Sequence, residues 1–384
     1  MIAWRAGVVV ECGARWDGAR EARVALDGQD RTVRALAYPA LVGELEPGAR
    51  VLLNVTALVR GLGTGGYALV VARTDALPAD APDAPGHLVK ARYTPLQAMV
   101  LGVDDQESPH HDTLRDADDL AGMPVVVADL HSALPAVLAG ARAAAADRGR
   151  PLRVAYVMTD GGALPAWFSR AVTGLRDAGW VDACITTGQA FGGDLEAVTV
   201  HTGLLAARHV VGADLAVVAQ GPGNLGTGTR WGFSGVAAGE AVNAAGVLGG
   251  RPVASLRVSG ADARERHLGV SHHSLTAYGR VALVPADVPV PVLAGLPGTP
   301  ADLTAPDDAE AWTALARRVT DQAAALAGPH GRHVTHDVPA GAALLDALRT
   351  SPVRLSTMGR GLDADPAAFL AAAVAGVHAV GLLG

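Results

Sequence analysis

A glycine-rich stretch, "GPGNLGTGTRWG" (221–232), directly follows the apolar run "ADLAVVAQ" (213–220). Glycines let successive backbone N–H groups turn toward one anion, and a helix beginning near Thr229 would add the positive end of its dipole. The stretch therefore predicts a site for a phosphate or carboxylate, with these residues as its donors: Gly221, Gly223, Gly226, Gly228 and Thr229. The alternative is a tight turn whose glycines only allow close packing of the next helix.

A second stretch, "ARERHLGVSHHS" (263–274), is dense in arginine and histidine. Arg264 and Arg266 are predicted to clamp an anion, because a guanidinium can bind a carboxylate or phosphate through two hydrogen bonds. Histidine moves protons near neutral pH, and this stretch has three candidates: His267, His272 and His273. The alternative is an exposed segment whose charges are solvated.

These two stretches, together with Asp160 of "MTDGG", define the first functional hypothesis. It is an enzyme, a hydrolase or a transferase, that binds a phosphorylated or otherwise anionic small molecule. Asp160 with His272 or His273 would supply the acid and the base. The glycine loop and the arginines would then meet on one ligand. A sensor or scaffold that binds such a ligand without turnover is the alternative from another class.

A metal-dependent hydrolase is the second hypothesis. Asp129 and His131 of "ADLHS" resemble the opening motif of the calcineurin-like metallophosphoesterases, in which Asp and His enter a two-metal cluster that activates water. Asp160 and Asp194 would complete the ligand set, and a divalent metal would be the cofactor. The later Gly-Asp-x-x-Asp and Gly-Asn-His motifs of that family are absent from the sequence. Alternatively, Asp129 or Ser132 only caps a helix.

From about residue 120, apolar runs alternate with helical stretches, and these elements must position the polar residues. Continuously apolar strands separated by helices indicate a doubly wound α/β domain, a mostly parallel sheet with helices on both faces. Ligands bind such sheets beyond the carboxyl ends of the strands. Strands are expected at 124–129, 153–160, 182–187, 214–220, 252–259 and 280–286. Helices are expected near 133–148, 164–178, 195–211 and 232–248.

Residues 1–73 are expected to form a small N-terminal all-β, barrel-like module, since short β-rich runs alternate with turn signals. The Pro-, Asp- and Ala-rich residues 74–90 are the expected linker. The α/β domain is assigned to 91–290. A Pro-rich passage and a helical tail packing on that domain are assigned to 291–384. Helices of the tail are expected near 307–327, 340–349 and 364–381.

The composition is that of a well-packed globular protein, since half of the 384 residues are hydrophobic and 18% are charged. A net charge of −7 leaves no basic stripe, so nucleic acid is not an expected partner. Two cysteines without C-x-x-C spacing favour a reducing cytoplasm. The apolar stretch from Pro366 is rich in Ala and Gly and lacks flanking Lys or Arg. It is expected to pack on the core or across a homo-oligomer, not to enter a membrane.

Two further resemblances extend this interpretation. The turn ending in "GTGT" and the later "GGRPVASL" are loosely similar to the nucleotide-binding region of the tubulin and FtsZ family, although "GNL" replaces its run of glycines and the lysine of a Walker A loop is absent. Longer motifs include "RALAYPALVGELEPGARVLLNVTA", "YVMTDGGALPAWFSRAV", "QAFGGDLEAV" and "RERHLGVSHHSLTAYGRVAL". By them the chain is identified as a member of domain-of-unknown-function family 3866, from the first strand to about residue 290. That resemblance carries no assigned activity and implies a bacterial cytosolic protein whose β module and α/β domain form one unit.

Overall fold

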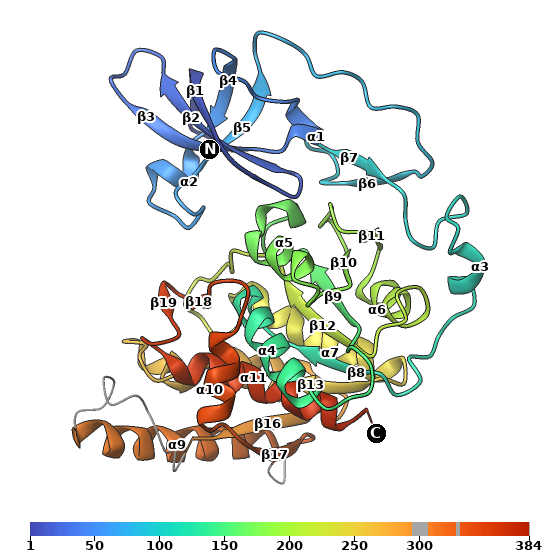
Figure 1. Ribbon diagram of the computed structural model, residues 1–384, viewed down its shortest axis with the longest axis vertical. Coiled ribbons are helices and arrows are strands. Elements are labelled where there is room, and N and C mark those ends of the chain that lie inside the picture. The colour runs from blue at the N-terminus through green and yellow to red at the C-terminus, as the bar shows by residue number, and fades with distance from the viewer. Residues whose placement is uncertain (294–305, 328–330, 384) are drawn as a thin grey trace.

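The computed structural model describes residues 1–293, 306–327 and 331–383. Figure 1 shows a small β barrel at the N-terminus above a larger layered α/β part. Residues 294–300 of the Pro-rich passage lie outside the described residues.

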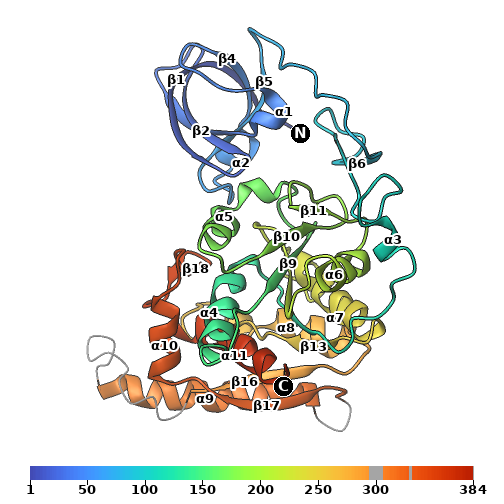
Figure 2. The same cartoon turned by 45° about the vertical axis from the view of Figure 1, so that its right-hand side comes forward.

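The N-terminal strands close into a five-stranded barrel in the order β1-β2-β3-β5-β4, and Figure 2 looks into it. The barrel-like module predicted from the sequence is therefore confirmed. All its neighbouring strands are antiparallel except β3 and β5, the arrangement of a Greek-key barrel of the OB type. Val24, Val51 and Leu53 fill its interior and are fully buried. The elements are β1 (Trp4–Trp16), β2 (Ala19–Leu26), β3 (Thr32–Ala37), α1 (Pro39–Val42), β4 (Arg50–Asn54), α2 (Thr56–Val59) and β5 (Ala68–Arg73).

An eight-stranded sheet forms the centre of the α/β part, and all of its strand pairs are parallel. Its order is β11-β10-β9-β12-β8-β13-β16-β17. The central strands β8 and β12 are buried along their whole length, as expected of strands covered on both faces. The predicted α/β fold class is confirmed. The strands are β8 (Pro124–Val127), β9 (Val154–Thr159), β10 (Ala183–Thr186), β11 (Leu195–Glu196), β12 (Leu215–Gln220), β13 (Arg251–Ala254), β16 (Asp287–Val292) and β17 (Val334–Pro339).

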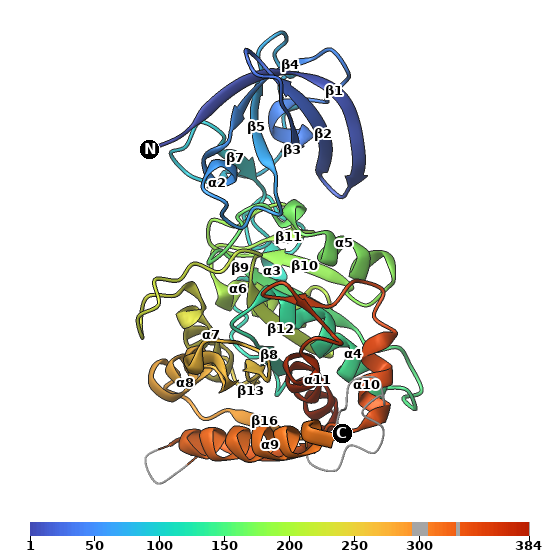
Figure 3. The same ribbon diagram turned by 90° about the vertical axis from the view of Figure 1, so that its left-hand side faces the viewer.

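Helices cover both faces of this sheet, which Figure 3 shows nearly edge-on. On one face α11 packs along α4 and touches α10, and on the other α7 packs beside α6 and the turn that follows α8. The helices are α4 (Leu134–Ala144), α5 (Arg170–Asp177), α6 (Val200–His209), α7 (Ala237–Val247), α8 (His272–Thr276), α9 (Pro306–Ala327), α10 (Ala342–Arg349) and α11 (Pro366–Gly381). Among the described residues, no helix is both long and apolar enough to cross a membrane.

Two strand predictions near the C-terminal side of the sheet are wrong in part. Residues 280–286 do not form a strand, because α8 continues into a π-helical turn (Ala277–Val281) and the strand begins only at Asp287. A short apolar run cannot be assigned to a strand or to a helical turn by its periodicity alone. The strand expected at 252–259 ends at Ala254, and Val258–Ser259 belongs to a separate hairpin.

The sheet also extends beyond residue 290, since β17 pairs with β16 along its whole length. The C-terminal part of the chain thus contributes an edge strand as well as helices. The remaining small elements lie before β8 or around the carboxyl edge of the sheet: β6 (Leu88–Lys90), β7 (Ala98–Val100), α3 (His111–Leu114), β14 (Val258–Ser259), β15 (Gly269–Val270), β18 (Ser356–Thr357) and β19 (Arg360–Gly361). The domain boundaries stay predictions.

Candidate functional site

The carboxyl edge of the sheet has a topological switch point between the neighbouring strands β8 and β12. The chain leaves β8 for α4 on one face and leaves β12 for α7 on the other, so the two loops diverge. Such a divergence opens a crevice at which α/β proteins bind ligands. A small pocket lies there, lined by Asp129, Gln220 and Ser234 among others.

Three histidines gather beside this switch point. His267 ends a short helical turn, while His272 and His273 open α8, and their ring nitrogens lie within 4.8 Å of one another. The Ser271 hydroxyl, 2.8 Å from Nδ1 of His267, also accepts a hydrogen bond from the backbone N–H of His273. Phe233 stacks on His273, with the ring centroids 3.7 Å apart. The hydroxyl and the stacking hold two of the rings in place.

The environment of His267 and His272 favours neutral rings. Burial and the charges of Arg257 and Arg264 lower the pKa of His267 to about 3. Burial and the neighbouring His273 lower the pKa of His272 to about 4. Within the part of the chain that the structure describes, the buried Nε2 atom of His272 has no hydrogen-bond partner. Neutral imidazoles with a free ring nitrogen are the form in which histidine binds metal ions.

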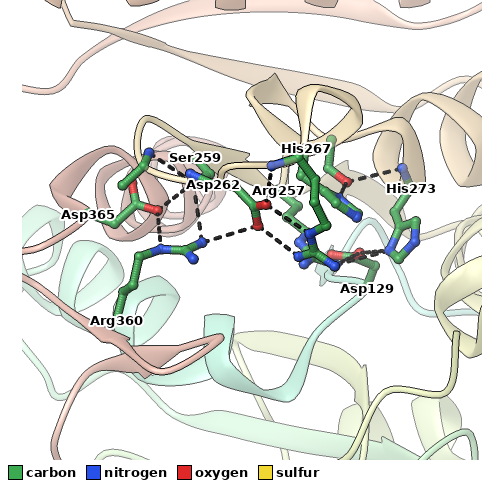
Figure 4. Close-up of polar contacts among 11 residues, drawn as sticks. Asp129, Arg257, Ser259, Asp262, His267, His273, Arg360 and Asp365 are labelled. Atoms are coloured by element: carbon green, nitrogen blue, oxygen red, sulfur yellow. Dashed lines mark hydrogen bonds and ion pairs between the residues drawn. The ribbon is translucent and has the colours of Figure 1, made fainter. Parts of the chain in front are cut away.

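Asp129 lies next to the histidine cluster and is 3% exposed. Its Oδ2 atom is 3.6 Å from Nδ1 of His273 and 3.7 Å from Nη1 of Arg257, and no described group donates a hydrogen bond to it. Arg257 donates to Nδ1 of His273 over 3.0 Å. Gln220, at the end of β12, donates to the backbone carbonyl of Asp129. These contacts join the ends of β8, β12 and β13 to the cluster, as Figure 4 shows for Asp129, Arg257 and His273.

A second group of charges lies on the other side of Arg257 (Figure 4). Asp262 accepts two hydrogen bonds from the guanidinium of Arg264, at 2.9 and 2.8 Å, and pairs with Arg360 at 3.3 Å. Arg360 also pairs with the buried Asp365. The hydrogen bonds from Arg264 hold the pKa of Asp262 well below its usual range. Arg264, expected to clamp an anion, is therefore neutralised by a carboxylate two residues away. A pocket lined by Asp129, Arg257, Asp262 and Arg360, among others, runs between the two groups.

In the glycine-rich loop after β12, one glycine fits the alternative of a tight turn, and the anion site stays a prediction. Gly221 packs tightly, since a Cβ there would lie 2.4 Å from the carbonyl oxygen of Ala163. Gly223, Gly226 and Gly228 are exposed. A Cβ on Gly228 would lie 3.6 Å from Nη2 of Arg266, so this loop and the histidine-rich segment do approach each other.

The helix expected near Thr229 is wrong in its position, because α7 begins only at Ala237 after a short turn. The loop instead closes on itself. Thr227 donates its backbone N–H to the carbonyl of Gly232, and the hydroxyl of Thr229 accepts from the N–H of Gly232. The dipole of α7 therefore does not begin at Thr229.

The residues of the second hypothesis do not converge on one point. His131 hydrogen-bonds Tyr156 and Ser169, and burial lowers its pKa to about 4. Asp194 accepts from the backbone of Cys184 and pairs with Arg176. Asp160, one strand from Gln220, accepts from the backbone of Gln189. Of that set, the structure brings only Asp129 to the histidine cluster.

Sequence reasoning missed Arg257, Phe233, Gln220 and Arg360. The strand expected at 252–259 contains Arg257, whereas β13 ends at Ala254. With the observed strand end, the rule that ligands bind after strand ends selects Arg257. Gln220 is the last residue of β12 and carried the same signal. Arg360 comes from a distant hairpin, and no local pattern marked it.

Fold and site together define a class: a doubly wound α/β protein with an N-terminal barrel and a histidine-, arginine- and aspartate-lined cleft at the carboxyl edge of its sheet. More particularly, the chain belongs to the family described as "Protein of unknown function (DUF3866)", whose model matches residues 34–376. The resemblance found in the sequence is confirmed. Comparison with curated proteins and with solved structures found no match.

Proposed function

We propose that this protein is a metal-dependent enzyme, with hydrolysis of a phosphorylated or otherwise anionic small molecule as its reaction. The observation that carries the proposal is the convergence of His267, His272 and His273 beside the buried Asp129 at the switch point of the sheet. Neutral imidazoles are borderline ligands that suit Zn²⁺ and related divalent ions.

The three histidines would hold the ion and leave a further coordination position for water or substrate, as catalytic zinc sites do. The ion would polarise a substrate oxygen and lower the pKa of a bound water. If His273 bound the ion through Nε2, its ring proton would lie on Nδ1, and Asp129, 3.6 Å from that nitrogen, would accept it in place of the present contact between Nδ1 and Arg257. Arg257 balances the buried charge of Asp129 and adds a positive charge beside the cluster.

An anionic substrate fits the positive groups around the cluster. Arg266 approaches Gly228 of the exposed glycine loop, and no hydrogen bond or ion pair within the described chain occupies its guanidinium. Arg257 lies deeper, toward Asp129. These two arginines would attract a phosphate or carboxylate toward the metal-binding histidines. Gly223, Gly226 and Gly228 would allow backbone donors of the loop to approach the same ligand.

Metal loading of purified variants tests the proposal. After removal of metals with a chelator, Zn²⁺ should restore hydrolysis of a chromogenic phosphate monoester in the wild-type protein and not in His272→Gln, because the variant lacks one ligand. His201→Gln is the matched control, since His201 is exposed and outside the cluster. Activity that is indifferent to chelators and to His272→Gln would contradict the proposal. Zn²⁺ binding and phosphate binding without turnover would favour the ligand-sensing alternative.

We also propose a cytoplasmic protein with a small-molecule ligand and without a nucleic-acid partner. The net charge of −7 and the two free cysteines, Cys12 and Cys184, support this assignment. The C-terminal helix expected at a homo-oligomer contact is largely buried against α4 and the sheet within one chain. A homo-oligomer stays a proposal, which the mass of the protein in solution tests.

A further inference from the structure

A second cluster of metal-binding side chains lies away from the candidate site, at the edge of the sheet formed by β16 and β17. Asp287 is the first residue of β16, His336 lies in β17, and His378 lies in the last turn of α11. Asp287 is at the amino end of its strand, so the cluster is at the opposite end of the sheet from the switch point.

The topology explains why these three side chains meet. β16 and β17 are parallel, with Pro289 opposite His336 and Asp287 opposite Val334. Side chains two residues apart on a strand point to the same face, so Asp287 and His336 share one face of the sheet. α11 packs on both strands and brings His378 to them.

The contacts within the cluster are short and specific. Nε2 of His336 lies 2.9 Å from Oδ1 of Asp287, and Nε2 of His378 lies 2.9 Å from Oδ2 of the same carboxylate. The two imidazole centroids are 4.4 Å apart. The three ligand atoms lie within 4.8 Å of one another. The side chain of His336 is 35% exposed, so an ion and its water ligand can reach the cluster from solvent.

We propose that Asp287, His336 and His378 form a site for a divalent transition-metal ion, with Zn²⁺ as the ion that the ligands fit best. Two imidazoles and one carboxylate are a common zinc ligand set, and water would complete the tetrahedron. His378 also lies at the carboxyl end of α11, where the helix dipole favours a cation. The bound ion would join the C-terminal helix to the edge strand of the sheet and stabilise both.

This site does not depend on the proposed function, and it can be tested in a variant that lacks a ligand of the first cluster. In a His272→Gln background, which removes a ligand of the first cluster, Co²⁺ added to chelator-treated protein should bind at one site per chain and show the visible absorption of tetrahedral cobalt. Zn²⁺ should displace it and raise the melting temperature. Adding His336→Gln should abolish the absorption and reduce the Zn²⁺ affinity at least tenfold.

His336→Gln is the variant of choice because its side chain is partly exposed, and His378→Gln on the buried helix serves as a second measurement of the same loss. His209→Gln, at an exposed position of α6 outside the cluster, is the control. Equal cobalt absorption and equal Zn²⁺ stabilisation with and without His336 would overturn the proposal. So would the absence of any Co²⁺ or Zn²⁺ binding in the His272→Gln background, because the three residues would then be only a hydrogen-bonded clasp.

Discussion

Asp129 carries a buried carboxylate, and the residues around it indicate its role. Asp129 does not cap a helix, because no side chain caps the helical turn or the helix that follows it. Ser132, the other capping candidate, donates to Thr357. A buried charge is costly unless a partner compensates it. Arg257 and His273 are the only Arg, Lys or His side chains within 4 Å of Asp129 in the described chain. The residue therefore belongs to the electrostatics of the candidate site.

Asp129→Asn should weaken Zn²⁺ binding by the histidine cluster about 10-fold to 100-fold, the usual effect of losing a carboxylate that orients a metal-binding histidine. The amide is close in shape, so the fold should persist. Zn²⁺ titration of chelator-treated protein measures the effect. Asp160→Asn is the matched control, since Asp160 also follows a central strand but lies outside the cluster. Unchanged affinity in Asp129→Asn would refute the positioning role of Asp129.

At the scale of elements, the closest packing is between α4 and α11. A Cβ on Gly140 would lie 2.0 Å from the carbonyl oxygen of Ala373, and a Cβ on Gly376 would lie 1.9 Å from that of Val137. The two helices can touch backbone to backbone only because these positions are glycine. This contact buries the apolar C-terminal helix and holds α4, which starts shortly after Asp129, against the sheet.

Gly376→Ala should lower the free energy of unfolding by about 1–3 kcal/mol, because the added methyl group forces the two helices apart. Gly381→Ala, in the last turn of the same helix, has open space around the new methyl group and serves as the control. Denaturant unfolding of both variants measures the difference. Equal effects of the two substitutions on the free energy of unfolding would show that the close contact at Gly376 does not stabilise the fold.

At the scale of the whole molecule, the barrel is joined to the α/β domain by the hairpin of β1 and β2. Trp16 donates its indole N–H to the backbone carbonyl of Trp167, 2.7 Å away. Glu21 of the barrel pairs with Arg170 at the start of α5 over 2.8 Å, and also with Arg34. Burial would raise the pKa of Glu21, but hydrogen bonds from Tyr67 and Arg34 and the charge of Arg170 lower it to about 2.

Glu21→Gln should therefore destabilise the protein by about 1 kcal/mol at neutral pH, the scale of a partly screened ion pair. The pKa of Glu21 in the folded protein is below its ordinary value of 4.5, so its contribution is complete above pH 4.5 and is lost as the pH falls toward 2. Urea unfolding at pH 7, 5 and 3.5 should show a difference from wild type that shrinks at the lowest pH. The control is Glu44→Gln, because Glu44 forms an exposed ion pair with Arg15 within the N-terminal module. A pH-independent difference would contradict this assignment.

The sequence by itself determined the fold class, because the alternation of apolar strands with helices and the β-rich N-terminus are local patterns that reflect burial on one or both faces. It also determined that polar loops follow the strands, and so it named Asp129, His272 and His273. The strand boundaries predicted from the sequence were wrong where an apolar run was equally compatible with a strand and a helical turn, as at residues 280–286.

Only the tertiary structure decided which of these residues meet. Whether Asp129 lies beside His273 or beside His131 and Asp194 depends on the order of strands in the sheet and on the face to which each loop turns. Likewise, Asp287, His336 and His378 lie on three elements whose proximity no local spacing encodes. Strand order arises from the long-range packing of all the elements together. The periodicity of one element shows only which of its own faces is buried. The sequence therefore predicted that the site lies at the carboxyl edge of the sheet, but not which side chains meet there.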